Sequence, residues 1–386
     1  MPDTRFVVQP DRISIIGETI DKLITADIAQ RDVVTELYRL AREKFDTPLS
    51  MNAARLLHES VKSGDVVFIT TGWPNRPRLS PEIAESDGPA GTVVLGRALQ
   101  KAANVLPVYV IEENLVNAMA TVAQAGGFKV LSPDEILLAL AEGISLEPAA
   151  LVLGFPSDPK EAENVAPNLF EQYNPAALIS IEKGGYNQEG LILTSWANDS
   201  TRYMAKVDFL IQEMKQHGKL LIGIGDGGNE IGMSAIANGI RDFLRFGDRI
   251  VPICKTDALV VASVSNWGAY GVAACLAFLK QDIGVFHDEN LERRILHACV
   301  DAGLIDGLTS RVEEGTDGLE VDVHAAVVAI LKKTVEMGIQ RARGVVLWKE
   351  HQPFPITPLS STPPFGSDVL AHEERLPVVD RGPIFG

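Results

Sequence analysis

A glycine-rich segment with polar side chains, GIGDGGNEIGM over residues 223–233, is the strongest chemical signal in the chain. It formally matches the dinucleotide-binding pattern G-x-G-x-x-G. However, Asp226 and Glu230 would place carboxylates where a pyrophosphate binds. Carboxylate and amide oxygens are hard ligands. They suit a hard divalent cation such as Mn²⁺ or Mg²⁺ better than they suit zinc. We therefore weigh a metal site against a helix N-terminus, with Asp226 or Asn229 as its cap and Glu230 in its first turn.

Three other junctions place polar residues near the end of an apolar run or in a long loop. Glu182 is a candidate metal ligand or general base, although a strand-end salt bridge with Lys183 would also explain it. Asp87 lies in a long loop, where an ordinary turn is the alternative to a functional role. Ser265 and Asn266 follow another apolar run and could line a small polar pocket.

Arginines provide candidates for binding a substrate carboxylate, chiefly Arg97 on a helix expected to begin near Gly91. A solvated helix face is the alternative explanation. Other catalytic patterns are missing from the sequence: no lysine closes the glycine turn as in Walker A, and there is no G-x-S-x-G. None of the seven histidines directly follows a predicted core strand. Carboxylates, lysines and a metal are left for acid–base chemistry.

The elements that must position these residues alternate between strands and helices. Helical periodicity marks residues 91–103, 114–125, 200–217 and 268–278. Short apolar runs typical of buried strands occupy residues 66–71, 106–111, 177–182, 220–225, 258–263 and 344–348. The alternation predicts an α/β fold with a three-layer, mostly parallel doubly wound sheet. In such sheets ligands bind beyond the carboxyl ends of the strands.

The sequence also predicts how the chain is divided. Residues 1–62 form a helical lead-in, and residues 63–349 form the α/β catalytic domain, with a smaller helical subdomain at about 285–340. Residues 350–386 are a proline-rich arm that cannot form a helix or a central strand. We expect the arm to lie across the surface or a neighbouring subunit, which would make the protein a homo-oligomer.

Composition limits the partners. The 386-residue chain has 51 acidic and 35 basic residues and a formal net charge of -16, which disfavours binding to nucleic acid or an anionic membrane. No apolar run is long enough to span a bilayer. The N-terminal residues lack the pattern of a secretory or import signal, so we expect a cytoplasmic protein.

The segment at residues 222–233 resembles the signature of the D-glutamate cyclase family. Other pieces resemble that family in order and type, namely Thr71-Gly72, residues 87–91, Ile181-Glu182 with the glycines that follow, and residues 265–268. The resemblance covers residues 66–318 and implies conversion of D-glutamate to 5-oxo-D-proline with loss of water. It also implies Mn²⁺ or Mg²⁺ near Asp226 and Glu230. The metal would polarise the carboxylate and Glu182 could accept the ammonium proton.

From the motifs and the resemblance together we predict metal and acid–base roles for Glu182, Asp226 and Glu230. The residues expected to contact a small amino acid or lactam are Asp87, Arg97, Lys183, Gly227, Gly228, Asn229, Ser265 and Asn266. The chain departs from the family pattern at residues 190–197 and at Ser234, and such changes beside a ligand can redirect specificity.

Three alternative functions stay open from the sequence. The first is a metal-dependent lactam or cyclic-amide hydrolase, which runs the same bond change in reverse. The second is a non-catalytic protein that binds a nucleotide or small anion in the glycine turn. The third is a non-catalytic homologue that serves as a subunit of an assembly.

Overall fold

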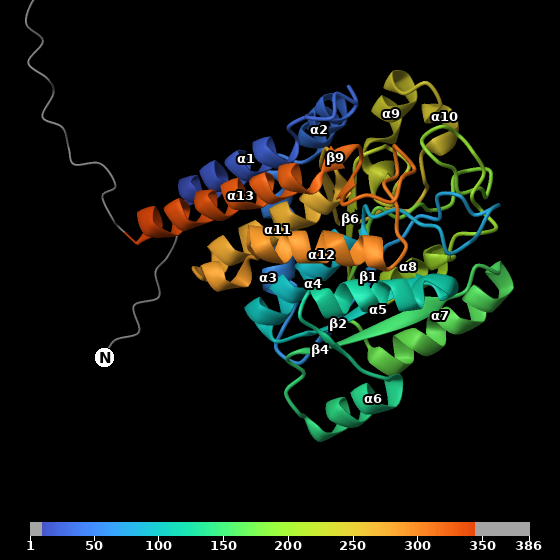
Figure 1. The fold of residues 1–386 in the computed structure, drawn as a ribbon, viewed down its shortest axis with the longest axis horizontal. Helices are drawn as coiled ribbons and strands as arrows, with labels where there is room; N and C mark the ends of the chain where they lie inside the picture. Colours follow the sequence, from blue (N-terminus) through green and yellow to red (C-terminus); the bar gives the residue numbers. More distant parts are fainter. Residues whose placement is uncertain (1–9, 344–386) are drawn as a thin grey trace, which may run out of the picture. The chain divides into compact units, whose positions relative to one another are not determined.

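A seven-stranded parallel sheet forms the centre of the computed structural model, which describes residues 10–343 (Figure 1). The strands run in the order β3-β4-β2-β1-β5-β6-β7, and every neighbouring pair is parallel. The strands are β1 (Val66–Thr70), β2 (Leu106–Glu112), β3 (Lys129–Val130), β4 (Ala149–Phe155), β5 (Ala177–Ile181), β6 (Leu220–Gly225) and β7 (Ala258–Val261). A short antiparallel pair, β8 (Gly315–Thr316) and β9 (Leu319–Glu320), lies outside this sheet.

Helices cover both faces of the sheet, because successive side chains of each strand point to opposite faces. In β1, Val67 and Ile69 join one core, whereas Val66 and Phe68 join the other. The helices of the first core are α1 (Pro10–Ile24), α2 (Val34–Lys44), α3 (Leu49–Ser60), α4 (Pro89–Ala103), α5 (Val116–Ala125), α9 (Ala237–Phe243), α11 (Ser265–Lys280), α12 (Glu289–Asp301) and α13 (Val321–Ala342). Those of the second core are α6 (Pro133–Glu142), α7 (Pro159–Tyr173) and α8 (Val207–Gln216). The three-layer α/β fold is therefore confirmed.

The remaining helical segments are short. They are α10 (Gly247–Ile250) and the 3₁₀ turns η1 (Glu113–Leu115), η2 (Met233–Ile236) and η3 (Ile283–Val285). Helices α1, α2 and α3 lie within residues 10–60 of the predicted lead-in, and α1 and α3 pack on α11. Helices α12 and α13 pack on one another, with α12 also on α5 and α13 on α1 and α11. Among the helices within residues 10–343, none combines the length and the apolar composition needed to cross a membrane.

The strand order reverses at the middle of the sheet. The chain leaves β1 for β2 on one side and later returns to pair β5 with the other edge of β1. The carboxyl ends of β1 and β5 therefore flank the topological switch point, where doubly wound sheets bind their ligands.

Among the described residues, four strands were not predicted from the sequence: β3 and β4 in the main sheet and the two-residue strands β8 and β9 outside it. Strand β3 has only two residues, too few for a periodic pattern, and β4 is an apolar run that we did not assign. Helix α8 begins at Val207, later than the predicted residue 200, because the residues before it form turns. The strand expected at residues 344–348 and the arm at residues 350–386 lie outside the described residues. The role of the arm in oligomers stays a prediction.

Candidate active site

A polar cavity of about 210 Å³ lies beyond the carboxyl ends of β1, β5 and β6. Glu182 follows β5 directly, and Asp226 follows β6. Both side chains line the cavity, together with Arg31 from the loop between α1 and α2 and Asp317 from the turn between β8 and β9. The cavity therefore occupies the switch point predicted from the fold.

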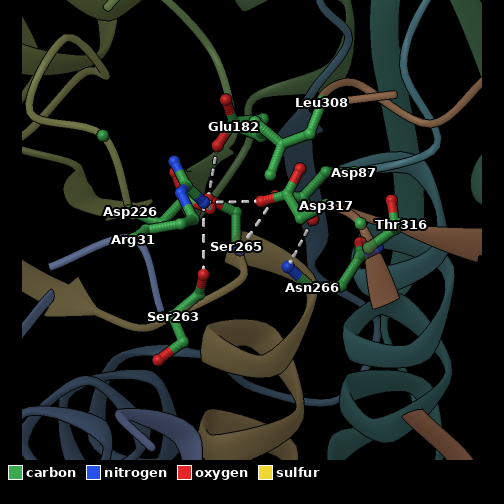
Figure 2. A network of polar contacts seen from close by, with 12 residues as sticks. Arg31, Asp87, Glu182, Asp226, Ser263, Ser265, Asn266, Leu308, Thr316 and Asp317 are labelled. Carbon is green, nitrogen blue, oxygen red and sulfur yellow. Dashed lines mark hydrogen bonds and ion pairs between the residues drawn. The ribbon is translucent and has the colours of Figure 1, made fainter. Parts of the chain in front are cut away.

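Three carboxylates converge here from separate parts of the chain (Figure 2). One oxygen of Asp87, one of Glu182 and one of Asp226 all lie within 4.8 Å of one another. All three residues are buried. The structure thus brings together two of the predicted metal ligands, Glu182 and Asp226, and adds Asp87, which had been expected to contact substrate.

Glu230 is directed elsewhere, which corrects its expected position among the metal ligands. Its Oε1 accepts the backbone N–H groups of Asp226 and Gly227 at 3.0 and 2.6 Å, and its Oε2 accepts that of Gly228 at 2.8 Å. Gly228 has a φ of 93°, a conformation that favours glycine. Burial and the nearby Asp226 carboxylate raise the pKa of Glu230 to about 7. We conclude that the Glu230 carboxylate stabilises the glycine turn by accepting hydrogen bonds from its backbone N–H groups.

The alternative of a helix N-terminus at the glycine turn is also wrong. Residues 226–230 lead into a bridge between Glu230 and Gly184, in which the Ile231 N–H donates to the Lys183 carbonyl at 2.8 Å. The next helical residues are those of the 3₁₀ turn η2. Neither Asp226 nor Asn229 therefore caps an α-helix.

Asp87 and Asn266 cap two neighbouring helices reciprocally. The carboxylate of Asp87, just before α4, accepts the N–H groups of Ser265 and Asn266 at the start of α11, at 2.9 and 2.8 Å. In return, Oδ1 of Asn266 accepts the N–H groups of Gly88 and Gly91 at the start of α4, at 3.0 and 2.6 Å. Helices α4 and α11 pack closely along their length. Their contact holds Asp87 beside the other carboxylates.

Glu182 is held in an unusual backbone conformation at the end of β5. Its φ is 46°, in the left-handed region that a non-glycine residue seldom adopts, and such strain often occurs at functional sites. The Ser265 hydroxyl donates to Oε2 of Glu182 at 2.5 Å. Burial, followed by repulsion from Asp226, raises the pKa of Glu182 well above its ordinary value. Glu182 is therefore a more basic carboxylate than an exposed glutamate.

Arg31 and Asp317 belong to the site but were not singled out in the sequence. Nη1 of Arg31 donates to Oδ2 of Asp226 at 3.0 Å and to Oδ2 of Asp317 at 2.7 Å, and Nη2 donates to Oδ1 of Asp226 at 3.3 Å (Figure 2). Arg31 comes from the helical lead-in, which showed no active-site pattern. For Asp317, the Asp-Gly pair that it forms with Gly318 indicated only a turn.

Negative charge exceeds positive charge around the cavity. Within residues 10–343, Arg31 is the one cationic side chain that forms ion pairs with these carboxylates. Burial is the main cause of raised pKa values here. The pKa values of Asp87 and Asp317 lie well above normal, and the pKa of Glu85 is raised to about 7. The buried carboxylates are Asp87, Glu182, Asp226, Glu230 and Asp317. Such a set is stabilised either by protons or by a bound cation.

Lys183 points away from the cavity, so the expectation that it contacts substrate is corrected. Lys183 is not among the residues that line the cavity. Its buried ammonium donates to the carbonyls of Thr71 and Gly72 at 3.2 and 3.1 Å and forms an ion pair with Glu112. Lys183 therefore ties the ends of β1, β2 and β5 together beneath the site.

Replacing Lys183 with methionine is expected to destabilise the protein by about 3–5 kcal/mol, because the Glu112 carboxylate would stay buried without its cation. Chemical denaturation monitored by circular dichroism measures this loss. The double variant Lys183→Met with Glu112→Gln serves as the control, and we expect it to recover much of the stability. A single variant as stable as the original protein would contradict the proposed role of the ion pair.

Arg97 also lies elsewhere. It is on α4 about 12 Å along the helix axis from Pro89, and it lines a different cavity together with Arg294 and Lys332. It does not line the acidic cavity. Of the other predicted substrate contacts, Gly227 and Asn229 line that cavity. Ser265 and Asn266 do not line it, and neither does Gly228, whose N–H donates to Glu230.

Comparison with known proteins now identifies the family. The family model described as "D-glutamate cyclase-like, C-terminal" matches residues 20–332. The chain belongs to this D-glutamate cyclase-like family. The resemblance noted in the sequence is therefore confirmed. The match includes every residue of the acidic cavity, from Arg31 to Asp317.

One relative is the mitochondrial D-glutamate cyclase of Homo sapiens. It is 28% identical over 214 residues, which cover 55% of this chain and 33% of the human protein. The matched region thus spans about a third of the relative's length. The name of the human protein places that protein in mitochondria, and a cytoplasmic location for this chain stays a prediction.

Part of the segment at residues 190–197, where the sequence was expected to depart from the family pattern, lines the cavity. Thr194, Ser195 and Trp196 form part of its wall, and Nδ2 of Asn229 donates to the Leu193 carbonyl at 3.1 Å. Trp196 is 70% exposed.

Proposed function

We propose that this protein cyclises D-glutamate to 5-oxo-D-proline with loss of water. The observation that carries the proposal is the convergence of Asp87, Glu182 and Asp226 at the switch point of a D-glutamate cyclase-like chain. The cavity is smaller than the roughly 300–1,000 Å³ of pockets for drug-sized ligands, which suits a single amino acid.

The reaction forms one bond and breaks another within the same molecule. The substrate amine attacks the carbon of the side-chain carboxylate, so a C–N bond forms and a C–O bond breaks. The ammonium loses two protons in total, and both leave with one carboxylate oxygen as water. Glu182 is placed to accept the first proton and to return it to the departing oxygen. Its raised pKa favours the first step, because a carboxylate of very low pKa is a poor proton acceptor.

The three converging oxygens also fit a divalent cation of the Mn²⁺ or Mg²⁺ type, because carboxylate oxygens are the ligands such ions prefer. Asp87, Asp226 and one oxygen of Glu182 would hold it. A bound ion would polarise the substrate carboxylate as a Lewis acid. Glu182 has two oxygens, so it can provide one ligand atom and exchange a proton through the other.

Arg31 is suited to fixing the geometry of the site. Its guanidinium holds Asp226 through two hydrogen bonds and Asp317 through a third. It lines the cavity and remains 21% exposed, so it can also face the α-carboxylate of an amino acid. Orientation of the amine against the carboxylate carbon then provides the proximity that a cyclisation requires.

The competing hypothesis of a nucleotide cradle is less well supported. In such a cradle the N–H groups of the glycine turn face the ligand phosphates. Here the N–H groups of Asp226, Gly227 and Gly228 donate to Glu230 instead. The carboxylates that face the cavity would also repel a phosphate.

Chiral chromatography of products tests the proposal. Metal-stripped protein is incubated with D-glutamate, L-glutamate or either enantiomer of 5-oxoproline, with and without added Mn²⁺. We expect D-selective interconversion that depends on the added metal. Net opening of 5-oxoproline without cyclisation would favour the hydrolase alternative. Absence of turnover with every substrate would refute the proposal and direct attention to the wall formed by residues 190–197.

A further inference from the structure

A second cavity, of about 600 Å³, lies on the helical layer that contains α4, α12 and α13 (Figure 1). Three cationic side chains line it: Arg97 from α4, Arg294 from α12 and Lys332 from α13. Asp288 is its single acidic lining residue. This local excess of positive charge stands out in a protein whose formal net charge is -16.

The one carboxylate in the cavity is already engaged. Asp288 caps α12, and its Oδ1 accepts the Leu291 N–H at 2.9 Å. Among the residues that the structure describes, none of the three cations forms an ion pair with a carboxylate. Burial lowers the pKa of Arg97 and Arg294 adds to this shift, whereas the carboxylates of Asp288 and Glu147 oppose it. The positive charge of the three cations therefore exceeds the negative charge of the carboxylates that line the cavity.

Two buried nitrogen atoms of the lining residues also lack hydrogen-bond partners within residues 10–343. They are Nη1 of Arg97 and Nδ1 of His287. His287 is only 2% exposed, and its Nε2 lies 2.9 Å from Oε2 of Glu292. Buried polar groups are nearly always hydrogen-bonded, and an unsatisfied one calls for a partner such as a ligand.

We propose that this cavity is a binding site for the phosphate group of a small phosphorylated molecule. The guanidinium forks of Arg97 and Arg294 match phosphate oxygens, and the Lys332 ammonium adds a third positive charge. Three cations suit a dianion with three acceptor oxygens better than they suit a single carboxylate. The site is separate from the acidic cavity, with which it shares no lining residue. It does not depend on the cyclase proposal.

Isothermal titration of the full chain with inorganic phosphate at constant ionic strength tests the site. We expect saturable binding to the original protein, with Arg97→Gln, Arg294→Gln and Lys332→Gln each weakening it about tenfold. Malonate, a dicarboxylate, is expected to bind more weakly. Because Arg294 is exposed, Arg294→Gln tests the site even if Arg97→Gln impairs folding.

Helices α12 and α13 each provide a matched control in a residue adjacent to the cavity cation. Arg293 on α12 pairs with Asp322, and Lys333 on α13 pairs with Glu336. Arg293→Gln and Lys333→Gln are expected to leave phosphate affinity unchanged. The proposal is overturned if phosphate gives no saturable binding or if all three cavity variants bind it normally. Tighter binding of malonate than of phosphate would overturn the assignment to a phosphate group.

Discussion

Replacing Glu182 with glutamine is expected to lower kcat for cyclisation by about 10²–10⁴-fold. Glutamine preserves the shape of the side chain and can still accept the Ser265 hydroxyl hydrogen bond. It cannot exchange a proton with the substrate, and it removes one negative ligand atom from the converging set. Initial rates of 5-oxoproline formation measure the effect over a range of D-glutamate concentrations.

The same variant should fold normally, which separates lost chemistry from lost structure. A neutral amide relieves the repulsion between Glu182 and Asp226, so thermal stability should stay equal or rise. Glu189→Gln is the matched control in the same loop, because Glu189 is exposed and lies 3.8 Å from Arg249. Its activity should match that of the original protein. Normal turnover by Glu182→Gln would exclude Glu182 as the proton carrier.

Removing divalent cations is expected to reduce turnover to background, and adding Mn²⁺ should restore it. The structural reason is the excess of buried carboxylate, which a cation neutralises. The same ion should stabilise the fold, by about 2.7 kcal/mol when its concentration is 100 times its Kd.

The stabilisation of the fold by the divalent cation should increase as the pH rises. Glu85 and Glu230 have pKa values raised to about 7, so between about pH 4.5 and 7 the folded protein binds more protons than the unfolded chain. Without metal, the free energy of unfolding therefore falls as the pH rises through this window. Protons and the cation compete for the same charge cluster, so the metal should bind more strongly when the carboxylates are ionised.

Thermal unfolding at about pH 5.5 and pH 8, with Mn²⁺ or with a chelator, measures this linkage. We expect a larger metal-induced rise in Tm at the higher pH. Asp87→Asn and Asp226→Asn should reduce the rise, whereas Asp248→Asn, a change at the start of the short helix α10, should not. Equal rises at both pH values, or none, would contradict a metal held by this cluster.

Much of the fold was predictable because buried parallel strands are continuous apolar runs. The positions of Glu182 and Asp226 followed from the same pattern, since both come directly after such a run. The direction of Glu230 did not follow, because it depends on how the N–H groups of the glycine turn are oriented. A sequence pattern locates a turn but does not give the orientation of its backbone.

Arg31 and Asp317 could not be found from local pattern. They are 286 residues apart and meet only after the first helices and the β8–β9 turn pack against the sheet. The direction of Lys183 did not follow from strand alternation either, because the left-handed conformation of Glu182 interrupts the extended chain just before it. The partner that makes this placement stable, Glu112, belongs to another strand.

The reciprocal caps formed by Asp87 and Asn266 limit how this protein can diverge. In many enzymes, replacing an active-site residue increases stability, because that residue supports activity at a cost in the stability of the fold. Here the carboxylate of Asp87 lies beside those of Glu182 and Asp226 and also accepts the first N–H groups of α11. A substitution at this position would lose activity and stability together. Selection for activity alone or for stability alone would therefore preserve Asp87. The cavity wall at residues 190–197 can vary without disturbing the helix caps formed by Asp87 and Asn266.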